Sequence, residues 1–485
     1  MKFKITSFLV ALTVSFYGFS QVTALDNVVK EMAQSPDLKN GLVAVAVYDA
    51  KTGEKLYVRN ENLSVSTAST TKLFSTAAAI SVLGNKQLET RFYIDGEIKD
   101  SVLYGNLWIR GGGDPSLGSS YLKNNTTAFL DAWVSEVKKL GIKAINGAII
   151  GDASEFGYKG CPDGWSWSDM GNAYGAYPSG LTIFDNILTF RIKTGADGTP
   201  TNLVSTTPNV PNLKFHNHIT SANVTGDNSI IYGAPYQNER IGIGSLQKST
   251  SISIRGSLPN PEFQVAYEFS NALKASGITI SDSILTARDL QFENKLDKNR
   301  YTQFNLLFTY QGITIAELIK LTNYHSVNMF AEQLACLLGY YKNGDGSINN
   351  GTKQLRDFWK TAIPSDGLFL MDGSGLSRSN AFSVNHLCSL LNYMYKSSSY
   401  KLFYESLPVT GVSGTLSDLC KNQAAHGKIH AKSGTMTRIK SYSGYATTNS
   451  GRELSFAVVL NNYSCNNYQA NIKLQKFLNV LVTLP

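Results

Sequence analysis

The stretch Ser66-Thr67-Ala68-Ser69-Thr70-Thr71-Lys72-Leu73-Phe74 places a hydroxyl and an amine three residues apart, directly before an apolar run from Leu73 to Leu83 that Gly84 ends. An apolar run closed by glycine predicts a helix, and on it Ser69 and Lys72 lie on one face, one turn apart. A serine hydroxyl is a poor nucleophile at neutral pH and needs an adjacent base. A lysine can be that base when burial and neighbouring positive charge lower its pKa.

The Ser-x-x-Lys spacing is a weak signal by itself, because it recurs elsewhere, for example at Ser398 and Lys401. Most such pairs are exposed to solvent. What distinguishes the first pair is its position at the start of a helix, where free backbone N–H groups stabilise developing negative charge. Its significance therefore depends on partners further along the chain.

The first residues have the composition of an export signal. Two lysines precede an apolar stretch from Phe8 to Phe19, and small residues allow cleavage after Ser20 or after Ala24. The stretch is too short to span a membrane as a helix, and no later stretch approaches the necessary length. We expect residues 1–24 to be a signal peptide and the protein to be periplasmic, soluble or at most loosely attached to the envelope.

Composition excludes several classes of protein. The 485 residues carry a formal charge of +8 that is scattered along the chain, so nucleic-acid binding has no specific support. The five cysteines are an odd number with no C-x-x-C, and the sequence selects no disulfide. His216 and His218 form a lone His-x-His without a zinc-protease motif, so no metal and no cofactor are expected.

Hydrophobic patterns indicate an α/β protein with a long insertion. Two alternating runs, Gly41 to Tyr48 and Lys55 to Val58, predict a β-hairpin directly before the Ser69 helix. Short strand-like runs such as Ile145 to Gly151 then fill the chain from about Arg91 to Arg300. Helical patterns return from Thr314.

The end of the chain is predicted to form strands followed by a terminal helix. Late strands from Ile429 to Ala446 and from Leu454 to Asn461 precede a helix from Tyr468 to Leu481, which we expect to pack on those strands. The simplest organisation is one α/β domain built from both chain ends, because an insertion is tolerated where a surface connection can lengthen.

Two later segments offer partners for the first pair. His325-Ser326-Val327-Asn328 lies between two helical patterns, and Lys432-Ser433-Gly434-Thr435 lies in the late strands. Taken singly, Ser326 and Asn328 could be helix caps and Lys432 a solvated edge-strand lysine. Taken in order, Ser-x-x-Lys, Ser-x-Asn and Lys-Ser-Gly form the triple found in penicillin-binding proteins and class A β-lactamases.

With these motifs the chain resembles the soluble D-alanyl-D-alanine carboxypeptidases and endopeptidases of the penicillin-binding protein 4 type. Further matching segments are Arg110 to Pro115, Trp165 to Asp169, Asn328 to Glu332, Asp372 to Arg378, Leu407 to Gly411 and Ala431 to Met436. The resemblance implies a β-lactamase- and transpeptidase-like domain with an antiparallel sheet and helices, interrupted by a β-rich insertion. The expected domains are residues 25–88 with 303–485 (catalytic), 89–176 with 264–302 (first insertion, α/β) and 177–263 (second insertion, β-rich).

The resemblance also implies catalytic roles. Ser69 would attack the penultimate carbonyl of a stem peptide with Lys72 as base, and water would resolve the acyl-enzyme. Ser326 and Lys432 would relay the proton to the leaving amine, and Asn328 would hold the substrate amide. β-Lactam antibiotics would acylate the same serine.

Substrate binding is expected at the late strand. Lys432, Ser433, Gly434 and Thr435 would bind the terminal carboxylate, with the N–H groups of Ser69 and Thr435 as the oxyanion hole.

Two charged residues have open assignments. Asp169 and Arg378 would contact a charged, diaminopimelate-like side chain of the stem peptide. The alternatives are that Asp169 caps a turn and that Arg378 makes an internal ion pair.

Two other functions remain open at this stage. A β-lactamase would hydrolyse its acyl-enzyme rapidly, but no well-supported deacylating glutamate motif lies between the first two signatures, which disfavours the class A type. A peptidoglycan-binding or scaffolding protein with a residual site would release no D-alanine, and the intact triple argues against it.

Overall fold

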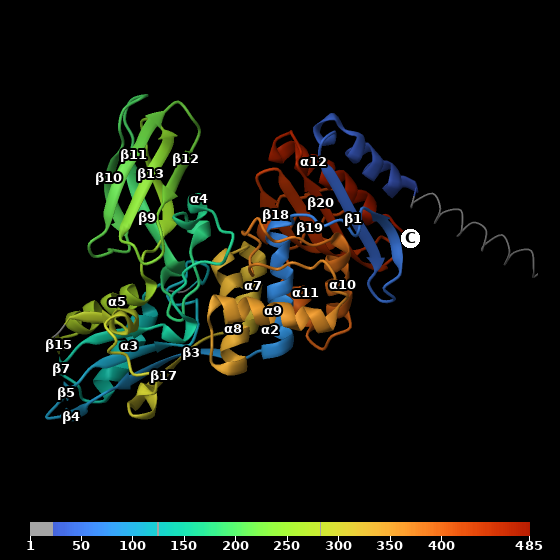
Figure 1. Ribbon diagram of the computed structural model, residues 1–485. Coiled ribbons are helices and arrows are strands. Elements are labelled where there is room, and N and C mark those ends of the chain that lie inside the picture. Colours follow the sequence, from blue (N-terminus) through green and yellow to red (C-terminus); the bar gives the residue numbers. More distant parts are fainter. Residues whose placement is uncertain (1–22, 124–125, 282) are drawn as a thin grey trace, which may run out of the picture. The chain divides into compact units, whose positions relative to one another are not determined.

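The computed structural model describes residues 23–485 except 124, 125 and 282 (Figure 1). All but the last two residues of the predicted signal peptide lie outside the described residues. Contacts divide the chain into two compact units: Met1–Gly84, Ile319–Val327 and Leu355–Pro485 form the first, and Asn85–Leu318 and Asn328–Gln354 form the second. The described residues before Gly84 therefore belong to the same unit as the C-terminal residues.

The first unit is built on a five-stranded antiparallel sheet in the order β18-β19-β20-β1-β2. The strands are β1 (Leu42–Asp49), β2 (Lys55–Arg59), β18 (Ile429–Met436), β19 (Ile439–Thr447) and β20 (Glu453–Asn461). The predicted hairpin is β1 and β2, and the predicted late strands are the other three. Since β1 pairs with β20, the two ends of the chain meet inside one sheet.

Helices cover both faces of this sheet (Figure 1). Val43, Val45 and Val47 of β1 pack in one core with a helix over residues 23–34 and with α12 (Asn467–Leu481). On the opposite face α10 (Val384–Tyr395) packs against β1, β19 and β20. Alternate residues of a strand point to opposite faces, which explains why one strand serves both layers. The predicted packing of the terminal helix on the late strands is confirmed.

The helix that follows the opening stretch is α2 (Lys72–Leu83), which ends at Gly84 as predicted. A 3₁₀ turn, Ala68–Thr71, precedes it. The ring of Phe74 meets Trp359 and Phe382 edge-on, at centroid distances of 5.4 and 4.9 Å, and the Trp359 indole N–H donates to the Phe74 carbonyl at 3.0 Å. These contacts fix the start of α2 inside the first unit. The other helices with residues in this unit are α7 (Ile315–His325), α9 (Ile348–Ala362) and α11 (Tyr400–Glu405).

The second unit contains four sheets, in the strand orders β16-β8-β6-β3-β17, β15-β7-β5-β4, β10-β9-β14 and β11-β13-β12. The strands are β3 (Gln87–Ile94), β4 (Glu97–Lys99), β5 (Val102–Tyr104), β6 (Leu107–Gly111), β7 (Ala144–Asn146), β8 (Ile149–Asp152), β9 (Ile187–Lys193), β10 (Asn202–Thr207), β11 (Lys214–Ala222), β12 (Asp227–Tyr232), β13 (Glu239–Gln247), β14 (Ser251–Ser257), β15 (Thr279–Ile280), β16 (Ile284–Thr286) and β17 (Asn305–Thr314). Its helices are α3 (Ala128–Lys139), α4 (Trp167–Met170), α5 (Pro261–Ala275), α6 (Ala287–Phe292) and α8 (Asn328–Asn343).

One predicted strand of the second unit is divided in the structure. The run from Ile145 to Gly151, expected as one strand, is two strands in two sheets, because the chain passes from β7 to β8 between them. The strand β17 pairs with β3 within this unit, and the resumption of the catalytic domain at residue 303 stays a prediction. The subdivision of the insertion into two domains stays a prediction.

No helix among residues 23–485, leaving aside 124, 125 and 282, combines the length and the hydropathy that a membrane span requires.

The aromatic contacts of α2 make Phe74 a test of what stabilises this helix. Replacing the fully buried Phe74 by alanine should lower the free energy of unfolding by about 3–5 kcal/mol, because it removes apolar contacts and leaves a cavity. The matched control is Phe369→Ala, since that ring is 59% exposed and its loss should cost less than about 1 kcal/mol. Urea denaturation of both variants measures the difference, and equal losses would show that α2 is not anchored in this way.

Candidate active site

The first pair of the site is Ser69 and Lys72. The Lys72 amine donates to Ser69 Oγ at 2.9 Å and to the Ser374 carbonyl at 2.7 Å, and its side chain is fully buried. Ser69 lies in the 3₁₀ turn, one turn before the first residue of α2, and not within the α-helix. The arrangement places an amine beside the hydroxyl, as a serine nucleophile requires.

A glycine-rich loop supplies the second partner of Lys72. The buried Asp372 carboxylate accepts hydrogen bonds from the backbone N–H groups of Gly375 and Ser377, at 2.7 and 2.6 Å, and from Asn380 Nδ2 at 2.7 Å. A Cβ on Gly375 would lie 2.1 Å from the Ala68 carbonyl, so only glycine lets the loop approach the Ser69 turn. The loop holds the Ser374 carbonyl toward Lys72. Asp372 and Ser374 lie in the segment Asp372 to Arg378 that resembles the penicillin-binding protein 4 type, but the sequence alone predicts no role for either residue.

The second pair is Ser326 and Lys432. The Lys432 amine donates to Ser326 Oγ at 2.7 Å and to the carbonyl of Ser433 at 2.7 Å. Burial lowers the pKa of Lys432 well below its ordinary value, and the positive charges of Lys72 and Lys440 lower it further. Ser326 follows the last residue of α7 with φ +60°, a conformation that costs energy for a residue with a side chain and is frequent at functional sites.

The strand β18 lies directly against the Ser69 turn. A Cβ on Gly434 would lie 2.4 Å from the Thr67 carbonyl and 3.1 Å from the Ser69 nitrogen, so no larger residue fits without displacement. Ser441 of β19 fixes the same contact by donating to the Thr67 carbonyl at 2.6 Å. The glycine of the Lys-Ser-Gly motif therefore brings the strand beside the serine.

These segments open onto one cavity of the first unit, with a volume of about 490 Å³. Among its lining residues are Ser69, Ser326, Ser433, Thr435, Thr415 and Lys440. Ser433 Oγ donates to Thr415 Oγ1 at 2.9 Å, and the Lys440 amine donates to Thr435 Oγ1 at 2.8 Å. The structure thus brings Ser69, Ser326 and the end of the Lys-Ser-Gly-Thr segment together, and the sequence analysis missed Thr415 and Lys440.

Asn328 and Asp169 belong to the second unit. Asn328 begins α8, and its Nδ2 donates to the Tyr174 carbonyl at 2.8 Å. The Tyr174 hydroxyl donates to Asp169 Oδ1 at 3.2 Å. One tyrosine therefore connects these two candidate residues. The boundary between the two units falls between Val327 and Asn328.

Arg378 and the pair His216 and His218 are the remaining residues with a sequence-based expectation. Arg378 is exposed and, within the part of the chain that the structure describes, has no carboxylate partner, so the internal ion pair is absent. His216 and His218 lie on β11, and the described residues hold no group of three or more His, Cys, Asp or Glu side chains that could bind a metal ion.

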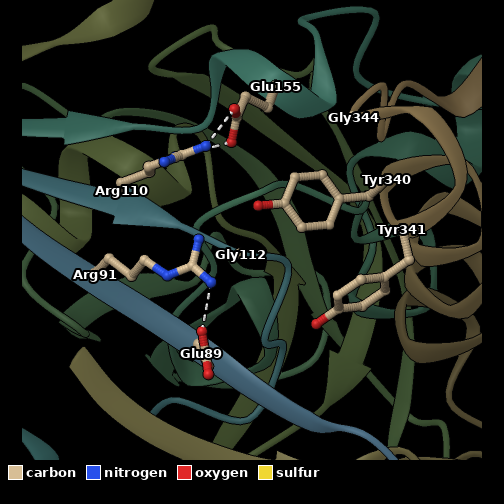
Figure 2. A pocket seen from close by; sticks show the side chains of 8 residues that line it. All are labelled: Glu89, Arg91, Arg110, Gly112, Glu155, Tyr340, Tyr341 and Gly344. Carbon is tan, nitrogen blue, oxygen red and sulfur yellow. Dashed lines mark hydrogen bonds and ion pairs between the residues drawn. The ribbon is translucent and has the colours of Figure 1, made fainter. Parts of the chain in front are cut away.

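A second cavity, of about 300 Å³, lies within the second unit (Figure 2). Arg110 faces Glu155 with a fork of two hydrogen bonds, at 2.6 and 3.0 Å, and Arg91 faces Glu89 at 2.6 Å. None of the described residues that line it is a serine or a lysine. Each guanidinium forms an ion pair with a carboxylate of the protein. Arg110, which begins the segment Arg110 to Pro115, therefore has a structural role.

Sequence comparisons agree with this geometry. The model of the D-Ala-D-Ala carboxypeptidase 3 (S13) family matches residues 25–480. A D-alanyl-D-alanine carboxypeptidase of Actinomadura sp. (strain R39) is 27% identical over 471 residues, which cover 92% of this chain and 82% of that protein. The D-alanyl-D-alanine carboxypeptidase DacB of Haemophilus influenzae is 28% identical over 428 residues, which cover 84% of this chain and 82% of that protein.

Solved structures show the same fold. The crystal structure of penicillin-binding protein 4 (dacB) from Haemophilus influenzae superposes with a TM-score of 0.79 at 23% identity, covering 95% of this chain and 98% of that one. The same protein in complex with a novel β-lactam gives a TM-score of 0.73 at 22% identity, covering 94% and 98%. The chain belongs to the D-Ala-D-Ala carboxypeptidase 3 (S13) family, and it is a serine-type D-alanyl-D-alanine carboxypeptidase of the penicillin-binding protein 4 type.

Proposed function

We propose that this carboxypeptidase trims peptidoglycan stem peptides through an acyl-enzyme on Ser69, that it also cleaves peptide cross-links, and that β-lactams acylate the same serine. The observation that carries the proposal is the hydrogen bond of 2.9 Å between the buried Lys72 amine and Ser69 Oγ, beside a cavity that Ser326 and the Lys-Ser-Gly-Thr segment also line. A signal peptide over residues 1–24 and export to the periplasm belong to the proposal.

Acylation begins at Lys72. A neutral amine can donate one N–H to the Ser374 carbonyl and turn its lone pair toward the Ser69 hydroxyl, which it deprotonates as Oγ attacks the penultimate carbonyl. Backbone N–H groups of Ser69 and Thr435 stabilise the oxyanion, and one such donor contributes about 3 kcal/mol in other enzymes. The close approach of Gly434 to the Ser69 nitrogen supports this placement.

The leaving amine needs a proton when the carbon–nitrogen bond breaks. The proton that Lys72 took from Ser69 passes through Ser326 Oγ, which Lys432 Nζ holds at 2.7 Å, to the nitrogen of the breaking bond, and D-alanine leaves as the neutral amine. Water then attacks the ester and regenerates the Ser69 hydroxyl. The direct hydrogen bond between Lys432 Nζ and Ser326 Oγ supports this role, because it fixes the orientation of the hydroxyl that carries the proton.

We assign recognition of the stem peptide to Asn328, Asp169 and Arg378. Asn328 holds the substrate amide, and Asp169, linked to it through Tyr174, faces an ammonium group of a diaminopimelate-like residue. Arg378, exposed and without a carboxylate partner among the described residues, faces the carboxylate of that residue. Opposite charges suit a ligand end that carries both groups.

The nucleophile is tested with a fluorescent penicillin. Ser69→Ala should abolish covalent labelling, and Lys72→Met should lower the acylation rate by about 10²–10⁴-fold, the usual contribution of a general base. Ser398→Ala is the matched control, because Ser398 is exposed and has the same spacing to Lys401. Labelling of the Ser69→Ala protein at another residue would show that the nucleophile is misassigned.

The fate of the acyl-enzyme separates this function from a β-lactamase. A chromogenic β-lactam should leave a long-lived adduct on Ser69 with little turnover, while a peptide ending in D-Ala-D-Ala should release D-alanine. Intact-mass spectrometry of the adduct and a D-alanine assay give the two readings. Rapid turnover of the β-lactam would make the protein a β-lactamase, and absence of D-alanine release would favour a binding protein.

The burial of the Lys432 amine predicts that the stability of the protein depends on pH. Its pKa is lower in the folded protein than the value near 10.4 of an unfolded chain, so the unfolded state binds more protons between these two values. Stability therefore rises with pH in that window, by up to about 1.4 kcal/mol per pH unit. The free energy of unfolding of the wild-type protein should therefore increase relative to that of Lys432→Met as the pH is raised. Urea denaturation of both proteins at several pH values measures this difference.

A control variant removes other titrating groups from the comparison. Lys401 is 84% exposed, and Lys401→Met should show no such pH-dependent difference from wild type. A constant difference between wild type and Lys432→Met across the whole window would mean that burial does not shift the pKa of Lys432.

A further inference from the structure

Lys440 stands beside the segment that receives the substrate. The hairpin β18–β19 pairs Thr435 with Lys440 across the two strands, and the Lys440 amine donates to Thr435 Oγ1 at 2.8 Å. Lys440 lines the same cavity as Ser69, Ser326 and Ser433. The side chain is half-buried, and its hydrogen bond to Thr435 holds the amine at the cavity wall.

The charge of this amine has no counter-ion in the described part of the chain. No carboxylate lies within ion-pair distance of Lys440, although the exposed Asp418 lines the same cavity. The ring of Tyr442 lies 5.7 Å from Nζ, and the positive charge of Lys440 contributes to lowering the pKa of Lys432. The contrast with the second unit is direct, because Arg110 and Arg91 each face a carboxylate. A half-buried cation without a counter-ion favours an anionic ligand.

Lys432 is less suited to hold that ligand. Its amine is fully buried and already donates to Ser326 Oγ and to the Ser433 carbonyl. A terminal carboxylate has two oxygens that accept hydrogen bonds, and a bond from a cation to such an oxygen is roughly twice as strong as a neutral one. Thr435 Oγ1 and Lys440 Nζ form such a pair at the cavity wall.

We propose that Lys440, together with Thr435, binds the terminal carboxylate of the D-Ala-D-Ala substrate and the equivalent carboxylate of β-lactams. Lys440 is then the charge that selects a free C-terminus, while Lys432 remains with Ser326 in proton transfer. This assignment rests on the proposed function and adds a specificity-determining residue to it.

The test compares two ligands that differ only in this charge, an N-acylated peptide ending in D-Ala-D-Ala and the same peptide ending in a carboxamide. Their binding is measured by calorimetry in the Ser69→Ala protein, which cannot turn them over. Adding Lys440→Met should weaken binding of the carboxylate peptide by about 10–100-fold, the range of a charge-assisted hydrogen bond, and change binding of the carboxamide by less than about threefold. Lys440→Arg should retain most of the preference.

Arg438→Asn is the control, because Arg438 is an exposed cation at the turn of the same hairpin and Asn tolerates its φ of +61°. It should change neither affinity. Equal losses for both peptides in the Lys440→Met protein would overturn the proposal, because they would show that Lys440 only positions Thr435. Unchanged affinity for the carboxylate peptide would overturn it as well.

The proposed function is read from a separate measurement. Release of D-alanine by the wild-type protein reports on catalysis, whereas the binding comparison in the Ser69→Ala background reports on Lys440. A wild-type protein that releases no D-alanine but loses its carboxylate preference with Lys440→Met would refute the acyl-enzyme and support the carboxylate site.

Discussion

The buried amine of Lys72 is the constraint around which the first unit is arranged. An amine that is fully removed from water must find hydrogen-bond partners inside the protein, and Lys72 has Ser69 Oγ on one side and the Ser374 carbonyl on the other. The second partner comes from a loop that the Asp372 carboxylate holds through hydrogen bonds from Gly375, Ser377 and Asn380. The reactive geometry thus depends on a loop about 300 residues away in the sequence.

Two glycines let separate segments approach the nucleophile. Gly375 brings the loop against the Ala68 carbonyl, and Gly434 brings β18 against the Thr67 carbonyl and the Ser69 nitrogen. A larger residue at either position would overlap backbone atoms, which cannot move aside as a flexible side chain can. The site is therefore defined as much by the absence of side chains at these positions as by the residues that carry the chemistry.

The parts that could be predicted from the sequence are those with local signals. Ser69 and Lys72 are one turn apart and are bonded to each other, and the pairing of Ser326 with Lys432 follows from the order of motifs. Ser374 and Lys440 have no such signal. The first contributes a backbone carbonyl, which any residue has, and the second faces Thr435 only because the two-residue turn of the β18–β19 hairpin fixes their register. The strands β10 to β13 have only a weak signal, because polar, exposed positions interrupt their apolar pattern and leave their bounds undefined in the sequence.

The pairing of β1 with β20 has a consequence for the order in which the enzyme can be made. The first strand of the sheet emerges early, but its neighbour on one side is completed only when residue 461 of 485 has been synthesised. Until then the nucleophile's turn lacks β18 and β19, and the early hairpin exposes an unpaired edge. Such distant pairing makes assembly slow and post-synthetic, so a chain truncated near its end would carry every catalytic side chain and still have no active site.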